Sequence, residues 1–147
     1  MTSNRARLRA AFLGAAIMIA TLGAASAQAA QRVEITGEVI DSWCYLTEIM
    51  YPEGTAHHLC AIWCAAGGIP VGILADDGTV YIVLKFEDDA TSVANPAVMA
   101  IQSHRITVEG DFYARDGINY LLIDRVVEDR GIVKLTHDDY GIQPFGE

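Results

Sequence analysis

Two Asp-Gly turns, each set between stretches of alternating apolar residues, constrain the fold of this chain more than any other feature. They stand at residues 76–78 (DDG) and 115–117 (RDG). Asp-Gly between two apolar runs is a strong signal for a tight β-hairpin, because both residues tolerate the positive φ that such turns require. Each turn therefore predicts two antiparallel strands, and the four predicted strands are residues 70–75, 79–86, 105–114 and 118–127.

The segment before the first hairpin combines a strand with a helix. Residues 33–41 (VEITGEVID) alternate as a strand, with Gly37 marking a bulge or a close approach of another chain segment. Residues 42–55 are predicted to be a loop with a turn at residues 52–54. Thr55 is then expected to cap a helix over residues 56–66, which Gly67-Gly68 ends.

A second, short helix is predicted between the two hairpins. Asn95 is a good N-cap, and proline directly after it suits the first helical position, so a helix to about Ser103 follows. After the last predicted strand, the tail is expected to add at most a short strand. The predicted order of elements is strand, helical insertion, hairpin, short helix, hairpin.

This order resembles the OB-fold, a five-stranded Greek-key barrel. The stretches "VEITGEVIDSWCY" and "ITVEGDFYARDGINYLLIDRVV" resemble its first strand and its closing hairpin. The resemblance implies a mainly β domain over residues 32–135, with a helical insertion after strand 1, a short helix between strands 3 and 4, and a C-terminal tail at residues 136–147. It implies a fold and no particular function.

The N-terminus has the pattern of a secretory signal. Arg5, Arg7 and Arg9 precede an apolar run at residues 10–25, and small residues at 25–29 allow cleavage after Ala27 or Ala29. A membrane anchor is the alternative, but the run is short for a membrane span. We expect residues 1–27 to be a cleaved signal peptide, and the mature protein to be periplasmic or secreted and to lie free of the membrane.

Loss of this segment would leave a strongly acidic protein. The chain has ten basic and 19 acidic residues, and three of the basic but none of the acidic ones lie in residues 1–27, so the remainder carries a formal charge of −12. Such a surface repels nucleic acid and anionic lipid. A protein partner or a cation suits it better.

A narrower resemblance rests on the cysteine motif. The pattern C-Y…H…C-A-x-x-C…G-G-I-P, from Cys44 to Pro70, is similar to a motif of small secreted bacterial OB-like proteins that have no established activity. The resemblance implies no catalytic residues. It implies that the helix with its cysteines and histidines belongs to the design of the domain.

Three ligand-type side chains share one face of the predicted helix. His57, Cys60 and Cys64 follow the i, i+3, i+7 spacing, whereas His58 points away. If the insertion folds back on the barrel, Cys44 can join them. Cys44, His57, Cys60 and Cys64 would then hold zinc, or copper with Met50 as a thioether neighbour.

Two alternatives to a metal site stay open. In an oxidising compartment Cys44 can form a disulfide with Cys60 or Cys64, which would make the domain a stapled protein-interaction module without metal. A thiol–disulfide redox protein is the third interpretation. Trp43, Tyr45 and Trp63 bracket the cysteines and could shield a metal, dock a partner, or simply pack.

The sequence contains no recognised enzyme signature. It has no G-x-S-x-G, no H-E-x-x-H, no phosphate-binding loop and no dinucleotide fingerprint. The spacing "CAIWC" is similar to that in the purple-copper centre of oxidases and in Sco-type assembly factors, but the residues that flank the cysteines in those families are missing. We therefore expect a non-catalytic accessory or carrier role.

Overall fold

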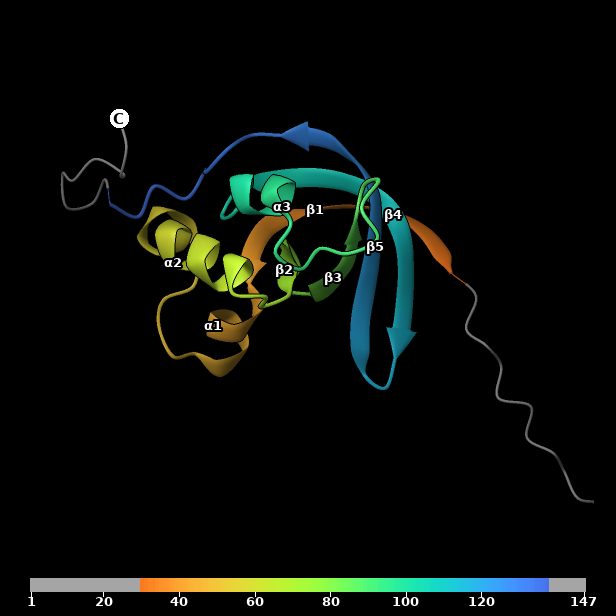
Figure 1. Cartoon of the computed structure of the whole chain (residues 1–147), viewed down its shortest axis with the longest axis horizontal. Coiled ribbons are helices and arrows are strands. Elements are labelled where there is room, and N and C mark those ends of the chain that lie inside the picture. The colour runs from red at the N-terminus through yellow and green to blue at the C-terminus, as the bar shows by residue number, and fades with distance from the viewer. Residues whose placement is uncertain (1–29, 138–147) are drawn as a thin grey trace, which may run out of the picture.

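Both Asp-Gly turns form the hairpins that the sequence predicts (Figure 1). The computed structural model describes residues 30–137. Its strands are β1 (Gln31–Asp41), β2 (Val71–Ala75), β3 (Val80–Phe86), β4 (Arg105–Arg115) and β5 (Ile118–Asp129), and its helices are α1 (Ser42–Thr47), α2 (Gly54–Ala66) and α3 (Pro96–Ala100).

The strands close into a barrel in the order β1-β2-β3-β5-β4. Strand β1 pairs antiparallel with both β2 and β4, and the barrel is closed by a parallel pairing of β3 with β5. This is the five-stranded OB-like barrel that the sequence predicts. The helical insertion follows β1, and α3 lies between β3 and β4 as expected.

Apolar side chains from all five strands fill the barrel. Ile73, Val108 and Leu121 have no exposed surface. The last five residues of β1, 37–41, are buried on both faces of the strand, because one face lines the core and the helical insertion covers the other. This double burial is what places Asp41 in the interior.

Gly37 marks a close approach, as its position in β1 predicts. A Cβ atom there would overlap the backbone carbonyl of Leu74 and lie 2.7 Å from Cγ2 of Ile73. Only a residue without a side chain therefore lets β1 and β2 pair at this point.

The predicted loop over residues 42–55 is wrong in its first half, where α1 forms. The carboxylate of Asp41 caps α1 by accepting hydrogen bonds from the backbone N–H groups of Trp43 and Cys44, at 2.9 and 3.3 Å. The helix ends at Thr47, and the next residue, Glu48, has a left-handed φ of 54°. Six residues are too few to show a helical repeat, so the cap was the only sequence signal for α1.

The predicted cap of α2 is also wrong. The helix begins at Gly54, and Thr55 lies within its first turn. The carbonyl of Lys134 accepts from the N–H of Thr55 at 3.0 Å, the hydroxyl of Thr136 accepts from Ala56 at 2.8 Å, and the carboxylate of Glu38 accepts from Gly54 at 2.7 Å. Residues far away in the sequence therefore accept the hydrogen bonds from the first N–H groups of α2, in place of a local capping side chain.

The segment after β5 forms no strand within the described residues, which end at residue 137. It crosses back over the barrel to the start of α2 (Figure 1).

Helix α2 ends as predicted at Gly67-Gly68, where Gly68 has a φ of 93°.

The short helix α3 has the expected cap. The side chain of Asn95 accepts from the N–H of Ala97 at 2.9 Å, and Pro96 is the first helical residue. The helix ends at Ala100, three residues before the predicted end.

Two predictions lie outside the described residues. They are the signal peptide at residues 1–27 and most of the tail at 136–147. Within residues 30–137, no helix is long and apolar enough to cross a membrane.

Candidate metal centre

The end of β1 and the two helices of the insertion meet at one buried point. Asp41 is the last residue of β1, and its Oδ1 atom caps α1. That cap orders the first turn of α1, and Cys44 in this turn is only 3% exposed. Asp41 is therefore both the last residue of β1 and the cap of α1, and its carboxylate bonds the backbone N–H of Cys44 directly.

Helix α2 turns one face toward this point, as its spacing predicts. His57 lies in the first turn of α2 with a side chain only 1% exposed, and half-buried Cys60 follows one turn later. His58 points elsewhere, because its Nδ1 atom lies 2.9 Å from the backbone carbonyl oxygen of Gln102, beyond α3.

Four ligand atoms converge where these elements meet. One donor atom from each of Asp41, Cys44, His57 and Cys60 lies within 4.8 Å of the other three. The group combines a carboxylate oxygen, an imidazole nitrogen and two sulfurs. This donor set is one that zinc takes in a tetrahedral arrangement.

Two of the four donor atoms make no hydrogen bond and contact only each other, at ion-pair distance. Oδ2 of Asp41 and Nε2 of His57 are fully buried, make no hydrogen bond, and lie 3.5 Å apart. Buried polar atoms are nearly always paired, since leaving one unpaired costs about 1–3 kcal/mol. A cation between these two atoms and the two sulfurs would satisfy both, so the residues present fit a metal ion.

The surroundings lower the pKa of the Asp41 carboxyl and raise the pKa of two thiols, those of Cys44 and Cys64. Burial opposes ionisation of Asp41, but hydrogen bonds from the thiols of Cys64 and Cys44 and from two backbone N–H groups outweigh it and lower the pKa of the carboxyl. Burial, followed by the contact with Asp41, raises the pKa of Cys44. The hydrogen bond to Asp41, followed by burial, raises the pKa of Cys64 to about 12.

Cys64, the fourth ligand predicted from the sequence, lies beside the group of four. Interaction with Asp41 raises the pKa of the Cys64 thiol and lowers that of the Asp41 carboxyl. All three cysteines are free thiols in the structure. The disulfide between Cys44 and Cys60 or Cys64 stays a prediction.

The aromatic residues around the cysteines lie mostly on the outside of the insertion. Trp43 is 54% exposed and Trp63 is 76% exposed, whereas Tyr45 is half-buried. Met50, the proposed thioether neighbour, is 47% exposed. Solvent-exposed tryptophans of this kind are better placed to contact a partner than to cover an ion.

Asp41 is the member of the group that sequence reasoning missed. The alternating pattern places Asp41 in the predicted strand, and residues 42–47 show no helical repeat that would reveal the helix it caps. The signal was available, since Asp three residues before a cysteine can cap a turn that brings both side chains together.

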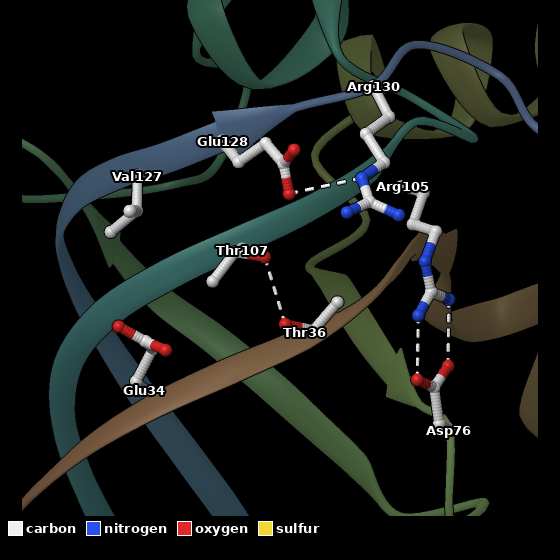
Figure 2. A pocket seen from close by; sticks show the side chains of 8 residues that line it. All are labelled: Glu34, Thr36, Asp76, Arg105, Thr107, Val127, Glu128 and Arg130. Atoms are coloured by element: carbon white, nitrogen blue, oxygen red, sulfur yellow. Dashed lines mark hydrogen bonds and ion pairs between the residues drawn. The ribbon is translucent and has the colours of Figure 1, made fainter.

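Apart from the candidate metal centre, a pocket of about 680 Å³ lies on the side of the barrel (Figure 2). Its two arginines are already paired: Arg105 forms a two-pronged ion pair with Asp76 at 2.7 and 2.6 Å, and Arg130 lies 3.0 Å from Glu128. Because these cations are neutralised by acids of the same pocket, we assign no ligand to it.

Comparison with known proteins returns no relative. No protein-family model matches the chain, no curated protein matches it, and no solved structure matches it. The geometry of the site therefore carries the functional proposal by itself.

Proposed function

We propose that this protein binds one transition-metal ion, zinc or copper, at the meeting point of β1, α1 and α2. The observation that carries the proposal is a pair of buried atoms without a hydrogen bond, Oδ2 of Asp41 and Nε2 of His57, which lie 3.5 Å apart beside two thiols. A bound cation would give both atoms the strong polar interaction that they lack.

The two candidate ions would use different donors of the same cluster. Zinc accepts oxygen, nitrogen and sulfur, so Asp41, Cys44, His57 and Cys60 suit it as they stand. Copper(I) prefers soft donors, so it would favour the three thiolates and the imidazole, with Cys64 in place of Asp41.

We further propose that the ion has a non-catalytic role, in an accessory or carrier protein. Asp41, Cys44 and His57 are at most 3% exposed, and a closed set of four protein donors leaves no position for a substrate. Cys60 and the neighbouring Cys64 are half-buried, so an ion would enter or leave on their side of the cluster.

The proposal places the protein outside the cytoplasm. The basic, apolar and small-residue pattern of residues 1–29 supports export, and the protein would then take up its ion in the periplasm or the medium. Its acidic balance favours a protein partner over nucleic acid or an anionic membrane surface.

Replacement of the two neighbouring histidines tests the metal site. We expect His57→Ala to weaken zinc binding at least 100-fold, because it removes one of four ligands from a buried site. His58→Ala is the matched control and should bind zinc like the unaltered protein, since His58 contacts the backbone of Gln102. Competition with a chromophoric chelator measures both, and equal affinities in the two variants would contradict the proposal.

The second candidate is a disulfide-stapled interaction module. The observation that favours it is the outer face of the insertion, where the large apolar side chains that exceed 40% exposure are Trp43, Leu46, Ile49, Met50, Tyr51, Leu59 and Trp63. Exposed apolar clusters of this kind mark protein-interaction surfaces.

Unfolding with and without a reductant separates the two candidates. A staple from Cys44 to Cys60 or Cys64 would close a loop of about 16–20 residues and stabilise the metal-free protein by about 3 kcal/mol in urea unfolding. A metal site predicts instead that zinc, added to the reduced protein, produces the stabilisation. The thiol–disulfide redox alternative needs a thiol of lowered pKa, whereas the pKa values of Cys44 and Cys64 are raised.

A further inference from the structure

The outward face of α2 carries no charged side chain. Its exposed residues are Ala56, Leu59, Trp63 and Ala66, which follow the spacing of one helical face. Trp63 is 76% exposed and Leu59 is 41% exposed, and the 13 residues of the helix include no Asp, Glu, Lys or Arg. A surface helix normally presents charged or polar side chains to solvent. This face therefore has the composition of a contact surface, and residues 30–137 leave it open.

The described chain ends at the start of this same face. His137 is the last described residue, and its backbone N–H donates to Oγ1 of Thr55, in the first turn of α2, at 3.2 Å. The hydroxyl of Thr136 accepts from the N–H of Ala56 at 2.8 Å, so the chain is held beside the first residue of the exposed face. The other end of the described chain, at the start of β1, lies on the side of the barrel remote from α2 (Figure 1).

The ten residues that follow in the sequence have the length and the composition to cover the face. Residues 138–147 (DDYGIQPFGE) contain two aspartates and then three large apolar side chains, those of Tyr140, Ile142 and Phe145. Ten extended residues span up to about 33 Å, whereas the 13 residues of α2 are about 20 Å long. The segment can therefore run along the whole helix.

The first two of these apolar side chains are within reach of the exposed ones on α2. An extended chain that leaves residue 137 beside the first turn reaches about 10 Å at Tyr140 and about 17 Å at Ile142. Leu59 and Trp63 lie about 5 and 11 Å along the helix axis from Ala56. The spacing of the two pairs is compatible, because both side chains of the segment reach as far as their counterparts on the helix.

A segment of the same chain suits this face better than a second copy does. From residue 28 onward the chain has seven basic and 19 acidic residues, a formal charge of −12, so two copies repel each other. Residues 138–147 are instead tethered at the first turn of α2, and a short tether gives a local concentration on the order of millimolar. The helix has no acidic residue that would repel Asp138 and Asp139.

We propose that residues 138–147 form a strap along the outer face of α2. In this arrangement Tyr140 packs on Leu59, and Ile142 packs on Trp63. The strap is a contact within one chain and does not depend on a metal ion. It occupies the α2 part of the exposed apolar surface, so a protein partner would have only the part around α1.

Nuclear Overhauser contacts between Trp63 and Ile142 test the strap directly. The sample is the chain from residue 28 onward, reduced and metal-free, with Trp43→Phe so that Trp63 is the only tryptophan. We expect contacts from the indole ring of Trp63 to the methyl groups of Ile142, and acrylamide quenching of Trp63 fluorescence well below that of free tryptophan. Both results should be independent of protein concentration, because the contact lies within one chain.

Two double substitutions in the same sample separate apolar packing from mere proximity. Tyr140→Ser with Ile142→Ser should raise the quenching constant of Trp63 about twofold, because the indole ring loses its apolar cover. Asp138→Ser with Gln143→Ser is the matched control, since it changes only polar residues of the strap, and it should leave the quenching unchanged. Far-ultraviolet circular dichroism should be the same for both, because neither change lies in the barrel.

Three outcomes would overturn the strap. Trp63 quenched like free tryptophan at every protein concentration would leave the face of α2 to a different protein. Quenching that falls as the protein concentration rises, with a dimer in sedimentation, would assign the face to a second copy. Equal quenching in the two double variants would show that Tyr140 and Ile142 do not cover the helix. Because no measurement uses zinc, none of these outcomes bears on the metal site.

Discussion

At the scale of single residues, Asp41 joins the barrel to the candidate metal centre through its two carboxylate oxygens. Oδ1 accepts the N–H groups that start α1, and Oδ2 lies beside His57 without a hydrogen bond. Oδ1 therefore contributes to the stability of the fold, whereas Oδ2 is the candidate ligand of an ion. Replacing Asp41 by asparagine or by alanine can distinguish the two contributions.

We predict that Asp41→Asn and Asp41→Ala both weaken zinc binding at least tenfold, because each removes the charged oxygen ligand. Only the alanine variant should lower the stability of the metal-free protein, by about 1 kcal/mol, because asparagine can still cap α1. Chelator competition and urea unfolding measure the two effects. Zinc affinity unchanged in Asp41→Asn would exclude Asp41 as a ligand.

The sequence could predict part of this site and not the rest. His57 and Cys60 share a helical face in any regular helix, so their spacing was enough to predict that they meet. Cys44 was included because the insertion was expected to fold back on the barrel. Asp41 was missed because its role depends on α1, a helix too short to leave a periodic pattern.

At the scale of elements, α2 depends on residues about 80 positions away in the chain. The carbonyl of Lys134 and the hydroxyl of Thr136 accept hydrogen bonds from its first turn, and the side chain of Lys134 lies 2.9 Å from the carboxylate of Glu38. Because His57 lies in that same turn, the segment after β5 helps to hold the candidate ligand in place.

We predict that Thr136→Val lowers the free energy of unfolding by about 1 kcal/mol, because the N–H of Ala56 loses its capping acceptor and the part-buried hydroxyl of Thr55 loses its partner. Thr47→Val is the matched control, since the hydroxyl of Thr47 bonds only the exposed backbone of α1, and it should change stability by less than about 0.5 kcal/mol. Urea unfolding of both variants checks this, and equal effects would show that Thr136 is not a cap.

The same contrast explains which elements could be predicted from the sequence. The two hairpins depend on turn residues that lie between their strands, so local chemistry determined them. The start of α2 depends on Lys134 and Thr136, and no local pattern records those contacts. Threonine is a common capping residue, but the first N–H groups of α2 bond to Lys134 and Thr136 instead, so the predicted cap at Thr55 is wrong.

At the scale of the whole molecule, the protein is an OB-like barrel with a helical insertion held against β1. The apolar core of the barrel includes Ala65 of α2, and the insertion also meets the end of β1 through Asp41, Cys44 and His57. A metal ion at this point would tie β1, α1 and α2 together. Its binding energy would add directly to the stability of the folded protein.

We therefore predict that zinc raises the melting temperature of the reduced protein and that a strong chelator reverses the change. Zinc at 100 times its dissociation constant stabilises the folded state by about 2.7 kcal/mol if the unfolded chain does not bind it. Differential scanning calorimetry measures the shift, and His57→Ala should abolish most of it. An equal shift in that variant would place zinc elsewhere on this acidic protein.

Native mass spectrometry of the reduced protein with one equivalent of zinc tests the central claim most directly. We predict one bound zinc ion in the unaltered protein and in His58→Ala, and none in His57→Ala. A companion measurement under denaturing conditions should find three thiols. Protein that takes up no ion, together with a mass deficit of two hydrogens in the unreduced sample, would contradict the metal site and favour a disulfide through Cys44.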